Sequence, residues 1–238
     1  MIRSLVTIRR ALPILVALTL AGCADEAAPV IRDVTVKQTD NEKTPLAAIV
    51  TLLTHEPARI RLDISDGTNG WSLDAEPDYD RSHEIPVFGL RPGREHSFTV
   101  YAIDESENSS VAGPFILAPI PLPDPFPDIR VTASNVSAME PGLTLFNLMH
   151  WYEDRRDVEY GSLVIINQLG EVVWFHEADF PILDAQQLEN GNILYMNSKY
   201  GMLVEVDMFG NAVSRWHSTG VPKDVPEGSI PVETETFH

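Results

Sequence analysis

The side chains of this sequence that could do chemistry are few and widely spaced. Histidine can act as a nucleophile, a proton carrier or a metal ligand. Seven histidines occur, and no two have the spacing of a metal-ligand pair: His55, His83, His96, His150, His176, His217 and His238. Serine-hydrolase, zinc-protease and phosphate-loop motifs do not occur. Residues 63–70 lack the alternating oxygen ligands of a calcium loop, so we expect a hairpin turn there. The spacing predicts no metal and no cofactor.

The only cysteine, Cys23, directly follows an apolar stretch near the N-terminus. Three arginines precede residues 11–20, an apolar run that is too short to span a bilayer at about 1.5 Å per residue. Residues 20–23 read Leu-Ala-Gly-Cys and resemble the lipobox of bacterial lipoproteins, whose cysteine is acylated. The resemblance implies that residues 1–22 are a lipoprotein signal peptide and that Cys23 carries the lipid. An ordinary signal peptide is the alternative.

The predicted anchor implies a location in the bacterial cell envelope, at the outer membrane and facing the periplasm. Without a second cysteine the chain cannot form an internal disulfide. Removing residues 1–22 takes away three of the 17 Lys and Arg and none of the 35 Asp and Glu, which leaves a formal net charge of −21. So acidic a chain is not expected to bind nucleic acid, although a local basic pocket stays possible.

Two segments repeat at a spacing of 40 residues, 161–176 and 201–217. The shared positions pair Gly161 with Gly201, Leu163 with Leu203, Val164 with Val204, and Gly170 with Gly210. Between the copies, Asn190-Gly191 joins two apolar runs, which is the strongest short signal of a β-hairpin. Short strands and tight turns that repeat every 40 residues or so are typical of β-propeller blades.

The propeller predicted over residues 129–238 is incomplete. A propeller closes its ring with roughly four to eight blades, whereas the 111 residues from Asp128 to His238 hold fewer than three. We therefore expect the front part of a longer protein, or a remnant of one. Trp174 and Trp216 end similar strands and are expected to pack between blades.

Residues 29–117 predict a separate β-sandwich domain. Residues 58–64 alternate between apolar and charged side chains, as a half-buried strand does. Residues 89–104 resemble the E–F corner and F strand of a fibronectin type III domain, in which His96 replaces the usual tyrosine and is expected to hydrogen-bond the corner backbone. Proline then occupies every second position in 118–128, which predicts an extended, semi-rigid linker.

This order of parts resembles the bacterial arylsulfotransferase family over nearly all of the mature chain. The resemblance rests on the Pro-Leu-Pro-Asp-Pro-Phe-Pro linker at 121–127, residues 139–146, the Gly-x-Leu-Val blade pattern, and residues 235–238. It implies an all-β fold: a fibronectin III-like or Ig-like β-sandwich, followed by the first blades of what is a six-bladed propeller in the family.

The same resemblance implies an activity. Members of the family transfer a sulfuryl group from a phenolic sulfate ester to an acceptor phenol through a sulfated histidine, without a nucleotide donor. The chemistry requires an imidazole nucleophile, cationic or N–H donors for the sulfate oxygens, and a proton donor for the departing phenolate. His238 matches the first histidine of the Phe-His-His segment of the family, so the resemblance assigns it a catalytic role in the central channel. The nucleophile and an arginine are expected in later blades, so a chain that ends at His238 is expected to be inactive.

A different class of function stays open. The chain would then be a lipid-anchored binding or scaffold module, in which the sandwich and the partial propeller present an exposed aromatic patch and an open blade edge to a partner. Nothing in the sequence shows the ligand-binding pattern of a quinone-dependent propeller dehydrogenase. The sequence leaves the oligomeric state open.

Overall fold

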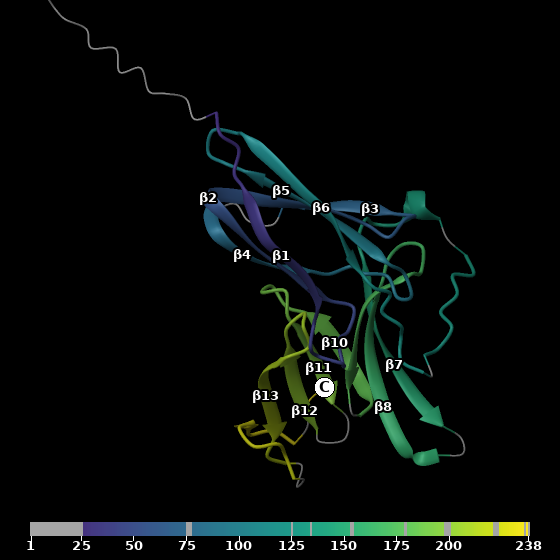
Figure 1. The fold of residues 1–238 in the computed structure, drawn as a ribbon. Helices are drawn as coiled ribbons and strands as arrows, with labels where there is room; N and C mark the ends of the chain where they lie inside the picture. Colours follow the sequence, from purple (N-terminus) through teal and green to yellow (C-terminus); the bar gives the residue numbers. More distant parts are fainter. Residues whose placement is uncertain are drawn as a thin grey trace, which may run out of the picture.

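The protein is described by a computed structural model over residues 26–74, 78–124, 126–133, 135–152, 155–178, 180–197, 201–220, 224–235 and 237. These residues form strands and one short 3-10 helix, η1 (Val136–Ala138), which confirms the predicted all-β class (Figure 1). The described part contains no helix that is long and apolar enough to cross a membrane.

The N-terminal domain is a sandwich built around one long strand. Its strands are β1 (Ile31–Gln38), β2 (Ala48–Ser65), β3 (Gly70–Asp74), β4 (Asp80–Val87), β5 (His96–Ile103) and β6 (Ser109–Leu117). The first half of β2 pairs with β1 and β4, and its second half pairs with β3 and β5. The pairing register with β4 shifts between Leu53 and Ala58, where β2 passes from one sheet to the other. A single strand therefore joins both layers.

The alternation predicted in residues 58–64 is confirmed, and it builds the core of the sandwich. Ile60, Leu62 and Ile64 of β2 pair with Ala102, Val100 and Phe98 of β5, and all six side chains are buried. Residues directly opposite in an antiparallel pair lie on the same face of the sheet. Full burial of each such Leu, Ile or Phe contributes about 1.5–3 kcal/mol.

His96 closes the corner between β4 and β5 as predicted. Its Nε2 accepts a hydrogen bond from the backbone N–H of Arg91 at 3.0 Å, and the side chain is buried. Because burial penalises the charged ring, the pKa of His96 is lowered from its ordinary value of 6.5. The predicted hairpin turn at 63–70 is also present, since the Asp66 carboxylate accepts hydrogen bonds from the backbone N–H groups of Thr68 and Asn69.

The C-terminal region contains two propeller-like sheets. The first propeller sheet consists of β7 (Thr144–Tyr152), β8 (Arg155–Ile166) and β9 (Val172–Ala178). The second propeller sheet consists of β10 (Ile182–Gln187), β11 (Ile193–Asn197), β12 (Met202–Val206), β13 (Ala212–Ser218) and β14 (Ile230–Val232). The hairpin β8–β9 corresponds in the repeat to β12–β13. The predicted Asn190-Gly191 turn joins β10 to β11. The parallel pairing of β14 with β13 was not predicted.

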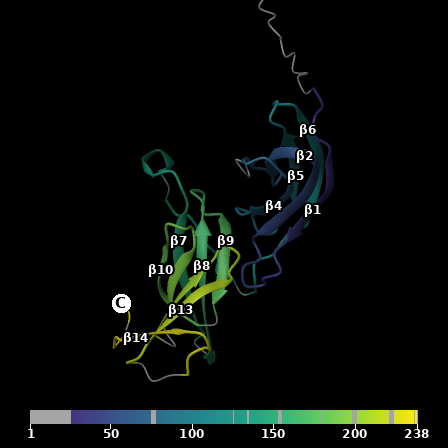
Figure 2. The same ribbon diagram turned by 90° about the vertical axis from the view of Figure 1, so that its left-hand side faces the viewer.

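The two propeller sheets pack face to face through an apolar layer (Figure 2). Trp174 of β9 is buried in this layer, and its indole N–H donates to the carbonyl oxygen of Met208 at 2.8 Å. This confirms the prediction that Trp174 packs between blades. Trp216 is only half-buried, and it pairs with Leu203 on the opposite face of the second propeller sheet.

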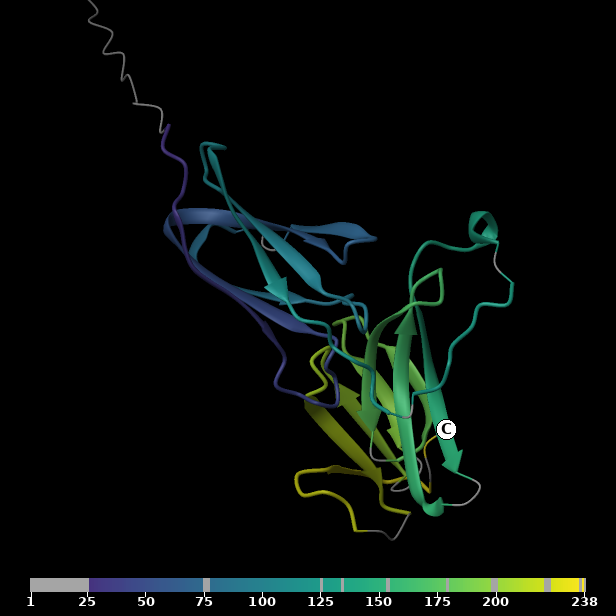
Figure 3. The ribbon, with the colours of Figure 1, turned by 45° about the vertical axis from the view of Figure 1, so that its right-hand side comes forward.

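The proline-rich segment is extended, but it does more than separate the domains. Figure 3 shows the chain between β6 and β7 running along the first propeller sheet and turning back at η1. The buried Ile120 packs into the core of the sandwich, and its carbonyl accepts from the N–H of Gly93 at 2.8 Å. Phe126 contacts Phe175 of β9 with ring centroids 5.8 Å apart. The apolar residues between the prolines thus join the cores of both domains. The domain limits 29–117, 118–128 and 129–238 stay predictions.

Candidate binding site between the propeller sheets

The two site residues predicted from the sequence, Cys23 and His238, lie outside the described residues. Among the histidines that are described, His96 closes the corner of the sandwich and His55 accepts a hydrogen bond from the backbone of Val30. Within the described ranges, no group of three or more His, Cys, Asp or Glu side chains is placed to hold a metal ion. One histidine, His176, lines a cavity.

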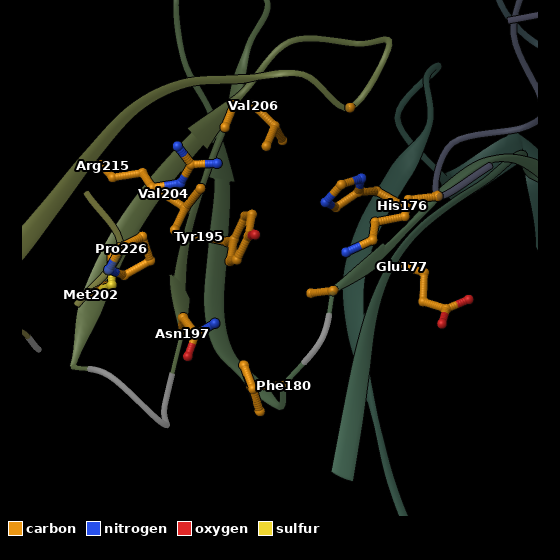
Figure 4. A pocket seen from close by; sticks show the side chains of 14 residues that line it. His176, Glu177, Phe180, Tyr195, Asn197, Met202, Val204, Val206, Arg215 and Pro226 are labelled. Carbon is orange, nitrogen blue, oxygen red and sulfur yellow. The ribbon is translucent and has the colours of Figure 1, made fainter. Parts of the chain in front are cut away.

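The cavity has a volume of about 300 Å³ and lies between the first and second propeller sheets (Figure 4). The polar and charged residues that line it are Lys43, His176, Glu177, Tyr195, Asn197 and Arg215. Its larger apolar lining residues are Phe180, Met202, Val204, Val206 and Pro226. The wall on the side of the first propeller sheet comes from β9 and the segment after it, and the opposite wall comes from β11, β12 and β13.

Strand pairing fixes the side chains of the wall on the second propeller sheet. Tyr195 of β11 pairs with Val204 of β12, which in turn pairs with Arg215 of β13. These three side chains therefore stand in one row across the face that meets the first propeller sheet. Because side chains alternate along a strand, Asn197 lies on the same face as Tyr195. Tyr195 and Asn197 are both buried.

His176 projects from the opposite wall, where alternation along β9 directs it toward the second propeller sheet. Its side chain is only 4% exposed. Nδ1 lies 2.9 Å from the hydroxyl oxygen of Thr44, a hydrogen bond that holds the plane of the ring. The ring stacks at 6.2 Å from that of Trp174 and lies 6.0 Å from that of Tyr195. Figure 4 shows the imidazole and the phenol projecting toward one another across the cavity.

The sandwich domain completes this site with its β1–β2 loop. The carbonyl of Lys43 accepts from the N–H of Glu177 at 2.8 Å, so the loop adds a hydrogen bond to the edge of β9. The side-chain amide of Asn41 donates to the carbonyl of Phe209 at 2.8 Å. The loop meets Gly210 so closely that an added Cβ would lie 2.8 Å from Nδ2 of Asn41. Lys43 thus reaches the cavity from a domain that is distant in sequence.

The charges around the cavity favour an anion. Lys43 and Arg215 each bring a positive charge, and Arg215 is exposed to solvent at the mouth. Glu177 also borders the cavity, but Figure 4 shows its carboxylate turned away from Tyr195. The imidazole, phenol and carboxamide of the lining can supply further hydrogen bonds. The arrangement is suited to binding an anion that also carries an apolar body.

An ionic cluster fixes the sandwich against the first propeller sheet. Arg94 donates to Asp66 and to Glu171, each at 2.7 Å. Burial alone would raise the pKa of Asp66, but hydrogen bonds from the backbone of Asn69 and Thr68 and from Arg94 outweigh it, and the pKa is lowered well below 3.8. The cluster gives the two domains a fixed contact outside the cavity.

This site could hardly be predicted from the sequence, because Thr44 and His176 meet across 132 positions of the chain. One signal was available in the repeat itself. His176 occupies the position that Trp216 takes in the second copy, so one copy of the repeat has a polar ring where the other has an apolar one. A departure of this kind from a structural repeat marks a position whose role is not only packing.

Comparison with known families identifies the N-terminal domain. Residues 42–112 match the family model of the arylsulfotransferase Ig-like domain, and the match extends from the β1–β2 loop into β6. A search among curated proteins finds no match to the chain. The matched region contains the loop that carries Lys43 and Thr44, together with Asp66 and Arg94 of the ionic cluster. The sandwich of this chain therefore matches the arylsulfotransferase Ig-like domain over residues 42–112.

Proposed function

We propose that this chain is the N-terminal part of an aryl-sulfate sulfotransferase. The enzyme would move a sulfuryl group from a phenolic sulfate ester to an acceptor phenol through a histidine. The match of residues 42–112 to the arylsulfotransferase Ig-like domain carries the proposal. The contacts of that domain with two propeller-like sheets support it, because they place the Ig-like domain and the start of a propeller in one packed unit.

In this proposal His238 lines the central channel of the propeller and takes part in the reaction. A sulfated imidazole is itself reactive, so the transfer would proceed in two steps, each with its own phenol. The structure describes neither His238 nor the residues that would form the rest of such a channel. None of the residues of the cavity between the propeller sheets is given a catalytic role.

The test uses the protein expressed from its complete reading frame. The protein is incubated with 4-nitrophenyl sulfate and phenol, and release of 4-nitrophenolate is followed by its absorbance. We expect release that depends on phenol and needs no nucleotide sulfate, and a loss of at least about a hundredfold in His238→Ala. His55→Ala, a histidine of the sandwich, is the matched control. Absence of release from the unaltered protein, or dependence on a nucleotide donor, would overturn the proposal.

We also propose that Cys23 carries a lipid that anchors the protein in the outer membrane of a bacterial cell envelope, facing the periplasm. The support is the Leu-Ala-Gly-Cys sequence at residues 20–23. Growth with radiolabelled palmitate should label the unaltered protein in the membrane fraction, whereas Cys23→Ser should carry no label. Equal labelling of both proteins would refute the anchor.

A binding or scaffold function is the second candidate, and one surface favours it. The face of the second propeller sheet away from the cavity carries Leu194, Met196 and Leu203, which are half-buried, together with Trp216. Light scattering after size-exclusion chromatography tests the candidate. Self-association that Leu203→Gln abolishes would support it, and a clean monomer would count against association through this face.

A further inference from the structure

We propose that the corner around His96 is an acid-sensitive switch, which holds the sandwich on the first propeller sheet and releases it when Nε2 of His96 takes up a proton. This inference goes beyond the proposed sulfotransferase activity and does not depend on it. It rests on two observations: the hydrogen bond of the ring, and the position of the same corner at the ionic cluster that joins the two domains.

The hydrogen bond of His96 determines where an added proton goes. Nε2 accepts from the backbone N–H of Arg91 at 3.0 Å, so this nitrogen carries no proton when the corner is closed. A proton at Nε2 would set two donors against each other, and the hydrogen bond would break. The ring is buried and lies edge-on to Trp71, with ring centroids 6.1 Å apart, so it has little room to turn away. The backbone at Arg91 is therefore the part that moves.

Arg91 passes this movement to the contact between the domains. Its Nε lies 3.5 Å from the carboxylate of Asp66 and 3.8 Å from that of Glu171, in the turn between β8 and β9. Three positions further along the same corner, Arg94 pairs with both carboxylates at 2.7 Å. A shift of the backbone in this corner thus draws both guanidinium groups away from Glu171 on the first propeller sheet.

The corner also holds the start of the proline-rich segment. The N–H of Gly93 donates to the carbonyl of Ile120 at 2.8 Å, and Ile120 is buried against the core of the sandwich. Further along this segment, Phe126 contacts Phe175 of β9. Opening of the corner therefore loosens the sandwich from the propeller at two places, the ionic cluster and the proline-rich segment.

The charges that face His96 come from both sides of the ring. Burial lowers the pKa of His96 from 6.5, and the guanidinium groups of Arg91 and Arg94 act in the same direction. The carboxylate of Asp66 and the backbone of Arg94 act in the opposite direction without cancelling the effect of burial. A ring whose pKa is lower in the closed corner stabilises docking above about pH 6.5, and this stabilisation is lost as the pH falls below that value.

The two carboxylates of the cluster titrate at lower pH than His96. Although burial alone would raise it, hydrogen bonds keep the pKa of Asp66 well below 3.8. A hydrogen bond from Asn167 helps to keep the pKa of Glu171 below 4.5. Both groups therefore stay charged while His96 takes up its proton, so release in mildly acidic solution is assigned to the histidine.

The test measures the distance between the domains in the full chain as a function of pH. Donor and acceptor dyes are attached at Val111→Cys on β6 and Val213→Cys on β13, two exposed positions, in a chain that also carries Cys23→Ser. Energy transfer should fall between about pH 7.5 and about pH 5, because the ratio of released to docked molecules rises up to about tenfold per pH unit below 6.5. Far-ultraviolet circular dichroism should stay unchanged, since both domains keep their strands.

Three variants separate His96 from other causes of release. His96→Gln offers an oxygen to the N–H of Arg91 but takes up no proton, so the fall in energy transfer should disappear. His83→Gln alters another buried histidine of the sandwich, on β4, and should keep the fall. Arg94→Met weakens the docked state and should move the midpoint to higher pH.

Three results would each overturn the proposal. The first is constant energy transfer in the unaltered chain over this pH range. The second is a fall that persists in His96→Gln, or a midpoint that Arg94→Met leaves in place. The third is a loss of circular dichroism that accompanies the fall in energy transfer, because the sandwich would then unfold and not separate from the propeller sheet.

Discussion

Replacing Arg94 with methionine should weaken the attachment of the Ig-like domain to the first propeller sheet. The guanidinium of Arg94 joins Asp66, on the sandwich, to Glu171, in the turn between β8 and β9, with both distances at 2.7 Å. Methionine keeps most of the apolar stem and removes both ion pairs. The substitution therefore tests the contribution of the charges more than that of packing.

The expected cost follows from the burial of the three groups. Removing one partner of a fully buried ion pair costs about 3–5 kcal/mol. The side chain of Asp66 is fully buried, but that of Arg94 is 35% exposed, so solvent screens part of the interaction. Asp66 also keeps its hydrogen bonds from the backbone of Thr68 and Asn69. We therefore expect Arg94→Met to lower the free energy of unfolding by about 2 kcal/mol.

Urea unfolding followed by far-ultraviolet circular dichroism measures this loss. The matched control is Arg61→Met, because Arg61 pairs with Asp63 at 2.9 Å on an exposed part of the same sandwich. Solvent screens an exposed pair of this kind, so Arg61→Met should cost clearly less than Arg94→Met. A loss in Arg94→Met that is no larger than the loss in Arg61→Met would refute the reasoning.

The pH dependence gives a second check on the same cluster. The pKa of Asp66 is lowered from 3.8, as a result of hydrogen bonds that outweigh its burial, and that of Glu171 is lowered from 4.5 mainly by its hydrogen bond with Asn167. A carboxyl group whose pKa is lower in the folded state stabilises the fold above its ordinary pKa, and this stabilisation is lost as the pH falls below it. The difference between the unaltered protein and Arg94→Met should therefore be complete above about pH 5 and decrease at lower pH.

Three further substitutions test other contacts. Gly210→Ala should cost about 3 kcal/mol in urea unfolding, because a Cβ there would lie 2.8 Å from Nδ2 of Asn41 in the β1–β2 loop. Gly228→Ala, at a similar positive φ but in open space, should cost about 1 kcal/mol, and equal costs would contradict the docking of the loop. Burial lowers the pKa of His96 from 6.5, so the free energy of unfolding should fall as the pH drops below 6.5. His96→Gln should flatten this pH dependence, and an unchanged dependence in the variant would contradict the role of His96 as a buried neutral ring. Trp174→Phe should lower the free energy of unfolding by about 1–2 kcal/mol, because it removes the hydrogen bond to the carbonyl of Met208. Thermal unfolding measures this loss, and an unchanged stability would show that the hydrogen bond contributes nothing.

Local patterns in the sequence predicted the elements that depend on neighbouring residues. The alternation of residues 58–64 gave a buried strand face, and Asn190-Gly191 gave the turn between β10 and β11. His96 could be assigned to the corner because its acceptor atom and Arg91 are only five positions apart. In each case the information lies within a few residues of the structure that it determines.

Features that depend on distant parts of the chain were not predicted. The passage of β2 between two sheets depends on which strands pair with each half, and the parallel addition of β14 depends on the edge of β13. The proline pattern predicted an extended linker but not the contact between Phe126 and Phe175. The cavity needs Lys43 beside His176, a proximity that arises only after the sandwich docks on the propeller sheets.

The most direct test of the proposed sulfotransferase is to look for the sulfated histidine. The protein from the complete reading frame is mixed with an aryl sulfate labelled with radioactive sulfur, without an acceptor, and is then separated from the free ester. A sulfated-histidine mechanism predicts a stoichiometric label on histidine that is stable in alkali, is lost in acid, and is released as a new aryl ester when phenol is added. A protein that acquires no label, yet transfers the group when donor and acceptor are present together, would contradict the histidine mechanism. A protein that neither acquires label nor transfers it would contradict the proposed function as a whole.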